Sequence, residues 1–265
     1  MRALGCWLLV LLLCTSCKWK ESRCPHIVQS DVTPVASPPD AAELLGQVAQ
    51  RYARLRSYSD SGCVSTSFSG KRPPIPGDRQ PFELVFARSS TLRLEMMKGT
   101  LGVAKQRFAL WTESGTIRSW WSVRPKIETH ATLSQGLTGV PVSGSVVSVA
   151  RLLLGRDSFA PWLVRLKNPH LRGVQRLPNG ADCYVIAGDT NIGQVELWVE
   201  RTTLAIHRTH ERFTLSSGRQ VDTTTIHRPR LEEPIDPASA RFAPPRTTNF
   251  LGIGDKSRDL VCRCD

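Results

Sequence analysis

The region from Phe82 to Val123 constrains the fold of this chain most, because apolar and polar residues alternate in four successive segments. The segments are residues 82–87, 92–96, 107–110 and 116–122, and short polar or glycine-containing stretches separate them. Side chains alternate between the two faces of a strand, so the pattern predicts a sheet with one apolar and one mainly polar face. The apolar face of such a sheet has to be covered by helices, a second sheet or a ligand.

Further strands are predicted before and after this region. Ser57–Ser69 alternates in the same way, and residues 126–130 form a short polar strand or connection. Later segments recur at intervals of about ten residues, at 173–177, 183–187, 194–200, 204–208, 211–215 and 219–226. This spacing, with an Asn179-Gly180 turn, favours an antiparallel barrel or curved sheet over a fold of alternating strands and helices.

Helices are predicted in two places. Asp40 is a suitable N-cap for a helix whose apolar residues recur every three or four positions up to Leu55. The segment 132–156 is the most apolar part of the chain after residue 17, and its glycines and Pro141 divide it into two short helices. The second of these is apolar on nearly all sides, so it must be buried unless it lies at a membrane or forms a lid.

The N-terminus has the features of a secretory signal. Arg2 supplies a positive charge, Leu4–Leu13 an apolar core, and residues 14–17 a cysteine- and serine-containing end. The apolar core is too short to span a membrane. The end resembles a bacterial lipobox, which implies that Cys17 is lipidated and tethers the chain to a membrane of the bacterial cell envelope. The expected location is periplasmic, with the outer membrane favoured because Lys18, and not Asp, follows Cys17.

The net charge of +12 leaves several partners open. It arises from 35 Lys and Arg against 23 Asp and Glu, scattered along the chain. The chain has no run of five basic residues and no basic motif interleaved with aromatic residues, so nucleic acid is not the expected partner. Anionic lipid head groups or an ordinary basic surface both account for the charge.

Five cysteines follow Cys17, and an oxidising compartment makes them disulfide candidates. They are Cys24, Cys63, Cys183, Cys262 and Cys264. Their positions make a disulfide between the two chain ends plausible. Because five is an odd number, at least one thiol is left without a partner among them. Zinc is not expected, because Cys262-Arg-Cys264 has no histidine nearby.

No catalytic signature is present, so an enzyme is not expected. The chain lacks a Gly-x-Ser-x-Gly elbow, a phosphate-binding loop and a His-Glu-x-x-His motif. The histidines are interpreted as surface residues, and no catalytic residue, cofactor or metal is assigned.

The order of the predicted elements resembles that of the LolA/LolB-like superfamily of periplasmic lipoprotein carriers and related envelope lipoproteins. The order is one helix, a long meander, a pair of apolar helices and a second meander. Within this superfamily, the chain is most similar to a poorly characterised group of predicted periplasmic proteins. Three stretches carry the resemblance: Tyr52–Gly62, Leu92-Arg93-Leu94-Glu95, and the hairpin from Val195–Glu200 to Leu204–Arg208. The resemblance covers about residues 40–245.

The resemblance implies an α+β, mostly β fold: a curved antiparallel sheet, or incomplete β-barrel, whose concave face is covered by helices. The domains would be a signal peptide (1–16), a proline-rich tether (17–39), a LolA-like half-barrel (40–250) and a cysteine-containing tail (251–265). Acyl chains of a lipid or of an acylated protein would lie in an apolar cavity. The inward-facing candidates are Phe82, Leu84, Phe86, Leu92, Leu94, Met96, Phe108, Leu110, Val195, Leu197 and Val199.

Leu101, in a loop between Gly99 and Gly102, occupies a place comparable to the apolar loop residue of LolB-like acceptors. The alternative is a structural or protein-interaction lipoprotein of the same fold, in which the eleven candidates only pack against the helices. Oligomeric state is left open.

Overall fold

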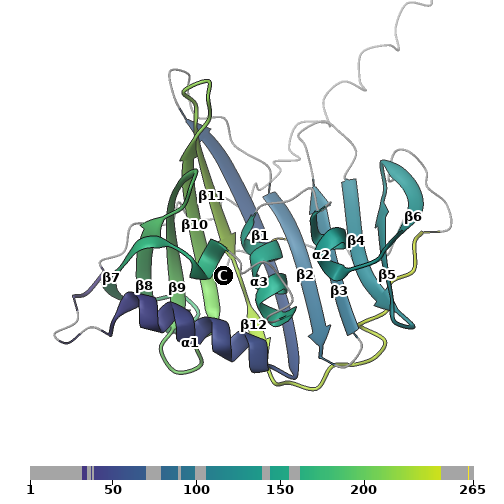
Figure 1. Cartoon of the computed structure of the whole chain (residues 1–265), viewed down its shortest axis with the longest axis horizontal. Helices are drawn as coiled ribbons and strands as arrows, with labels where there is room; N and C mark the ends of the chain where they lie inside the picture. The colour runs from purple at the N-terminus through teal and green to yellow at the C-terminus, as the bar shows by residue number, and fades with distance from the viewer. Residues whose placement is uncertain are drawn as a thin grey trace, which may run out of the picture. The chain divides into compact units, whose positions relative to one another are not determined.

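The computed structural model of the chain describes residues 32–34, 37, 39–69, 79–88, 91–98, 106–138, 144–154, 162–245 and 262. Within these ranges twelve strands form one antiparallel sheet accompanied by three α-helices (Figure 1). The elements are α1 (Ala41–Arg54), β1 (Ser57–Ser69), β2 (Arg79–Ala87), β3 (Thr91–Lys98), β4 (Gln106–Glu113), β5 (Thr116–Trp121), β6 (Arg124–His130), α2 (Leu133–Thr138), α3 (Gly144–Leu154), the short 3-10 helix η2 (Trp162–Val164), β7 (Lys167–Arg176), β8 (Asp182–Asp189), β9 (Gly193–Glu200), β10 (Ile206–Thr214), β11 (Gln220–Ile226) and β12 (Pro229–Leu231). The predicted mostly β fold is confirmed.

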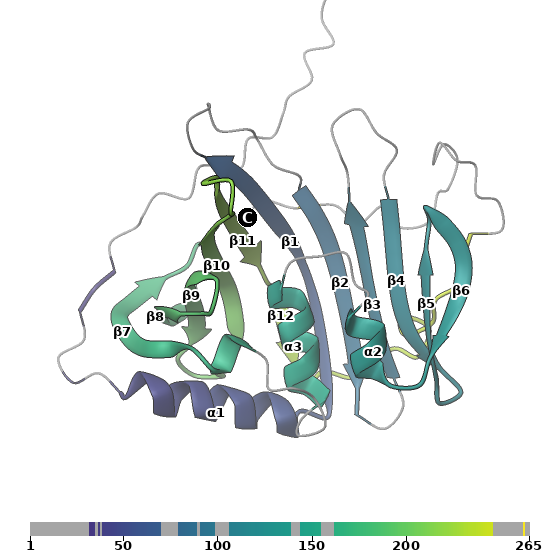
Figure 2. The ribbon, with the colours of Figure 1, turned by 45° about the horizontal axis from the view of Figure 1, so that its top comes forward.

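Strand β1 joins the two meanders into one sheet. The strand order β6-β5-β4-β3-β2-β1-β11-β10-β9-β8-β7 places the first meander on one side of β1 and the second on the other, and β12 also pairs with β1. The end strands β6 and β7 are not neighbours in this order, so the curved sheet is not closed into a barrel (Figures 1 and 2). The hairpin from β4 to β5 turns through Ser114 and Gly115, whose φ angles of 49° and 78° suit a two-residue turn.

Helix α1 begins at the predicted cap and buries the predicted stripe. The backbone N–H of Glu43 donates to Oδ1 of Asp40 at 2.8 Å. At the other end, Nε of Arg88 donates to the carbonyl oxygen of Leu55 at 2.8 Å. The hydroxyl of Tyr52 accepts the N–H of Ile206 at 3.0 Å, which ties the helix to β10. The buried residues of the stripe are Ala41, Leu44, Leu45, Val48 and Tyr52.

The predicted division of the apolar insert into two helices is confirmed. Helix α2 contacts β5 and β6, whereas α3 packs against α1 and η2. Figure 2 shows all three α-helices over the same face of the sheet. Helix α3 is buried on nearly every side, through Ser145, Val146, Val147, Ser148, Val149, Ala150, Leu152 and Leu153. No helix in the described part of the chain is long and apolar enough to cross a membrane.

The opposite, convex face of β2–β4 was predicted to be mainly polar, but it buries its charges. Arg93 and Glu95 are only 4% and 3% exposed. Arg93 forms ion pairs with both Glu83 and Glu95, and Nη2 of Arg107 lies 2.6 Å from Oε2 of Glu95. Charges can be buried in this way because each has a hydrogen-bonded partner of opposite sign.

The C-terminal segment covers this convex face beside the ion pairs. The ring of Phe242 packs on Trp111 and Trp120, with centroid distances of 4.8 and 5.9 Å. The guanidinium of Arg107 lies over the same ring at 5.3 Å. Phe242 itself is only 9% exposed, so this irregular segment is anchored on the sheet.

Two of the predicted disulfide cysteines are bonded to each other, and a third is a free thiol. Cys63 on β1 is disulfide-bonded to Cys262, with 5.3 Å between their Cα atoms. Cys183 is not a disulfide cysteine in the described structure: it is a buried free thiol on β8 that packs with Val185 and Trp198. Burial raises the pKa of Cys183 to about 12, so its thiol stays protonated and unreactive. Cys24 and Cys264 lie outside the described residues.

Part of the expected tether packs on the domain. The N–H and carbonyl groups of Thr33 both hydrogen-bond to Val174 on β7, each at 2.9 Å. Val32 packs against the small cluster of Cys183 and its neighbours. Residues 32–34 therefore lie along the edge of β7, although their proline-rich context predicted a free linker. The rest of the predicted tether, Cys17 included, lies largely outside the described residues.

Candidate functional site

The eleven predicted cavity residues lie together on the concave, helix-covered face of the sheet. All belong to one apolar core, and each is between 0% and 6% exposed. Leu84, Leu94 and Leu110 stand opposite one another across β2, β3 and β4, as the alternation predicted. The same core contains Val48 of α1 and Leu153 of α3, so side chains of the helices pack against the concave face. Their role in ligand binding stays a prediction.

A buried polar network interrupts this apolar face. Oδ2 of Asp60 accepts the hydroxyl of Tyr58 at 3.0 Å and lies 2.7 Å from Nδ1 of His227, while Oδ1 accepts the N–H of Arg228 at 2.8 Å. Asp60 and His227 are 2% and 1% exposed. Burial raises the pKa of Tyr58 well above its usual value, so its hydroxyl remains a donor. The interpretation of the histidines as surface residues is therefore wrong for His227.

Two polar contacts fix the N-terminal end of α3 to the sheet. The hydroxyls of Ser145 and Thr225 are 2.6 Å apart, and both residues are fully buried. Glu211 on β10 accepts the backbone N–H of Ser145. Burial raises the pKa of Glu211 to about 7, although this hydrogen bond and the nearby His210 act in the opposite direction. Ser145 thus adds two polar contacts to the apolar packing of α3 against the core.

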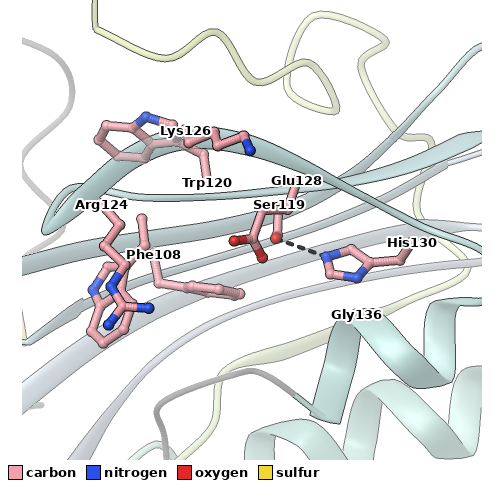
Figure 3. Close-up of a pocket in the computed structure, with 9 residues that line it drawn as sticks. Phe108, Ser119, Trp120, Arg124, Lys126, Glu128, His130 and Gly136 are labelled. Atoms are coloured by element: carbon pink, nitrogen blue, oxygen red, sulfur yellow. Dashed lines mark hydrogen bonds between the residues drawn. The ribbon is translucent and has the colours of Figure 1, made fainter.

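The concave face is open at the β4–β6 end, beside α2, where a pocket of about 200 Å³ lies (Figure 3). Phe108 of β4 belongs both to the apolar core and to this pocket. The pocket therefore continues the apolar face beyond the part that α1 and α3 cover. Its lining residues are Phe108, Ser119, Trp120, Trp121, Arg124, Lys126, Glu128, His130 and Gly136.

One wall of the pocket carries a serine–histidine pair. Oγ of Ser119 on β5 lies 2.8 Å from Nε2 of His130 on β6 (Figure 3). In the described part of the chain no carboxylate hydrogen-bonds the other ring nitrogen, so the pair lacks the third member of a catalytic triad. Its hydrogen-bonding groups suit recognition of a polar ligand group instead. The described residues also hold no cluster of three or more potential metal ligands.

The rim on β6 is charged. Arg124, Lys126 and Glu128 are all exposed, and none of the three has an ion pair with another described residue. By contrast, Arg118 on the neighbouring strand β5 is paired with Glu113 at 2.8 Å. The lining of the pocket thus combines aromatic side chains with charged side chains that have no ion-pair partner among the described residues.

Sequence reasoning found the apolar wall of the site but not its rim. Of the eleven predicted residues, only Phe108 lines the pocket. Residues 126–130 were predicted as no more than a polar strand or connection, and Arg124 was not singled out. The one available signal was the pair Trp120-Trp121 directly before this polar segment. Leu101 and Cys17 lie outside the described residues.

The unclosed antiparallel sheet with helices over its concave face is the architecture that the resemblance to the LolA/LolB-like superfamily implies. No protein-family model and no curated protein matches the chain.

Several solved structures are similar to this chain. A putative outer membrane lipoprotein-sorting protein domain from Vibrio parahaemolyticus has 12% identity and a TM-score of 0.33, over 75% of this chain and 95% of that chain. A LolA superfamily protein from Nitrosomonas europaea has 12% identity and a TM-score of 0.31, over 77% and 99%. The Pseudomonas aeruginosa MucA/MucB complex gives 13% identity and a TM-score of 0.42, over 77% and 62%. Likenesses at this level say nothing about what this chain binds.

Proposed function

We propose that this protein is a membrane-anchored cell-envelope lipoprotein that binds an acyl chain, of a lipid or of an acylated partner, at its concave face and serves in lipid or lipoprotein handling. The observation that carries the proposal is the pocket at the β4–β6 end, which is an open continuation of the apolar core through Phe108. The anchor is Cys17, at the end of the signal-like segment.

The volume of the pocket suits a short aliphatic segment. At about 30 Å³ for a group the size of a water molecule or a methylene, 200 Å³ holds roughly seven such groups. Burying them stabilises the complex by about 6 kcal/mol at 0.8 kcal/mol per CH₂, before the entropic cost of association. The pocket alone therefore holds the end of an acyl chain and not its full length.

A longer chain would need the space that α3 occupies. Helix α3 is apolar on nearly all sides, so its departure would expose apolar surface both on the sheet and on itself. An acyl chain could then lie along the row of Phe108, Met96 and Phe82, which stand opposite one another across β4, β3 and β2. In this proposal α3 acts as a lid that the acyl chain displaces.

A second candidate is a scaffold or protein-interaction lipoprotein of the same fold. The observation that favours it is the tight packing of the eleven concave residues against α1 and α3, with exposures of no more than 6%. In this alternative the interior is complete without a ligand, and partners bind elsewhere.

Calorimetric titration of the mature domain with octanol, whose chain matches the pocket, distinguishes the two. The acyl-binding function predicts saturable binding that Phe108→Trp weakens about tenfold by filling the pocket. The matched variant Phe68→Trp, at a partly buried position on β1 away from the pocket, should bind as the parent does. Absence of octanol binding, together with a purified domain free of lipid in native mass spectrometry, would favour the scaffold.

The anchor is tested separately. Cys17→Ser should release the full-length chain from the membrane fraction and abolish lipoprotein maturation, and fractionation of inner and outer membranes gives the location. Membrane association that survives the substitution would place the anchor elsewhere.

A further inference from the structure

We infer that the rim of the pocket selects amphiphiles with an anionic head group, a carboxylate or a phosphate, through Arg124 and Lys126. The inference rests on the proposed function, because the aliphatic part of the same molecule has to occupy the pocket. It adds the chemical class of the head group, which the apolar wall does not specify.

The two cations are available to a ligand. Both lie on β6, both are exposed, and neither is paired with a carboxylate in the described part of the chain. Other described arginines near this end of the sheet already have carboxylate partners, as Arg118 and Arg107 do. A guanidinium and an ammonium at the mouth of an apolar pocket suit an anionic group attached to an aliphatic chain.

The Ser119–His130 pair offers a further donor in either arrangement of its shared proton. If the serine hydroxyl donates to Nε2 of the histidine, Nδ1 of the neutral ring carries a proton that can be donated elsewhere. If Nε2 donates to the serine oxygen, the serine O–H is free to donate. Figure 3 shows Arg124 and this pair at opposite ends of the pocket, with Phe108 between them in that view.

Glu128 carries a negative charge at the same rim. Removing this charge should therefore change the binding of anions in the opposite direction to removing the positive charges. Glu128 stands opposite Ser119 in the β5–β6 register, is exposed and has no cationic partner among the described residues. Its carboxylate repels an anionic head group in the pocket. Neutralising Glu128 should therefore strengthen the binding of anions, whereas neutralising its two basic neighbours on β6 should weaken it.

Four probes with the same aliphatic chain test the inference: octanoate, octyl phosphate, octanol and octylammonium, titrated calorimetrically into the mature domain at low salt. The anions should bind about fivefold to tenfold more tightly than octanol, the cation more weakly, and the preference should shrink as salt is added. The octanoate and octyl phosphate arms show whether the site suits the head group of a fatty acid or that of a phospholipid.

The variant pair Arg124→Gln and Lys126→Gln should remove the preference, so that octanoate binds no more tightly than octanol does. The control variant Arg54→Gln with Arg56→Gln changes the net charge by the same amount at two exposed positions at the end of α1. It should preserve the preference for anions. Glu128→Gln should increase octanoate affinity about twofold to fivefold. Equal binding of octanol and octanoate, or a preference that survives in the Arg124/Lys126 variant, overturns the inference alone. Absence of binding by all four probes overturns the proposed function and the inference with it.

Discussion

The carboxylate of Asp60 lies 2.7 Å from the imidazole Nδ1 of His227, and both side chains are buried within the apolar concave face. The two residues are far apart in sequence, so this contact joins β1 to the segment that follows β11. Asp60 also accepts hydrogen bonds from Tyr58 and from the backbone of Arg228.

Asp60→Asn should destabilise the domain, because an amide donates where the carboxylate accepts and leaves buried donors without partners. The expected loss is about 2–4 kcal/mol in the free energy of unfolding, measured by urea denaturation. Asp182→Asn, at an exposed position on β8, should change it by less than about 0.5 kcal/mol. Equal effects of the two substitutions would contradict a structural role for the buried network.

Glu211 should make the stability of the domain depend on pH. Its pKa of about 7 in the folded state lies above its ordinary value of 4.5, so the folded state binds more protons between these two values. The free energy of unfolding therefore falls as the pH rises from about 4.5 to 7, by at most about 3 kcal/mol. Urea denaturation at several pH values measures this dependence. In Glu211→Gln the free energy of unfolding should change less with pH between 4.5 and 7, whereas the exposed control Glu113→Gln should keep the slope of the parent. A slope unchanged in Glu211→Gln would assign the titration to another group.

Local patterns predicted the elements of this fold well. Alternation located the strands around Leu84 and Leu94, the Asp40 cap located the start of α1, and glycines located the break between α2 and α3. These features depend on residues close in sequence, so one sequence is enough to find them. The segments predicted at 204–208 and 211–215 are a single strand, β10, whose pairing with β9 is irregular between Ile206 and Arg208.

Features that depend on distant residues could not be predicted. Arg93 and Glu95 alternate with leucines and look like a solvated face, yet Phe242 and its neighbours, more than a hundred residues later, help to cover that face. Asp60 lies among serines in a polar-looking strand, and only the fold places it next to His227. The charged rim of the pocket has no local pattern that separates it from any exposed edge strand, where charges are common.

Phe242 should contribute to stability although it belongs to the irregular C-terminal segment. Phe242→Ala would remove the ring that packs on Trp111 and Trp120 and lies beneath Arg107, at an expected cost of about 2–4 kcal/mol. Exposure of the two tryptophans should also shift the fluorescence of the folded protein to longer wavelength. Phe68→Ala, which removes a partly buried ring on β1, should cost less and leave the spectrum unchanged. A spectrum insensitive to Phe242→Ala would show that the segment does not cover these tryptophans in solution.

The movement proposed for α3 can be prevented with a disulfide. The hydroxyl oxygens of Ser145 and Thr225 are 2.6 Å apart, so the side chains point toward each other, and Ser145→Cys with Thr225→Cys should join α3 to β11 through an S–S bond of about 2.0 Å. The locked protein should still bind octanol, because the pocket at the β4–β6 end does not require α3 to leave. Its affinity for hexadecanoate, whose chain exceeds the pocket, should fall at least about tenfold, since the remaining methylenes lose their burial. The two single-cysteine variants serve as controls and should bind both probes as the parent does. If the locked protein takes up hexadecanoate as tightly as these controls, α3 is not a lid, and the long chain is bound without opening the concave face.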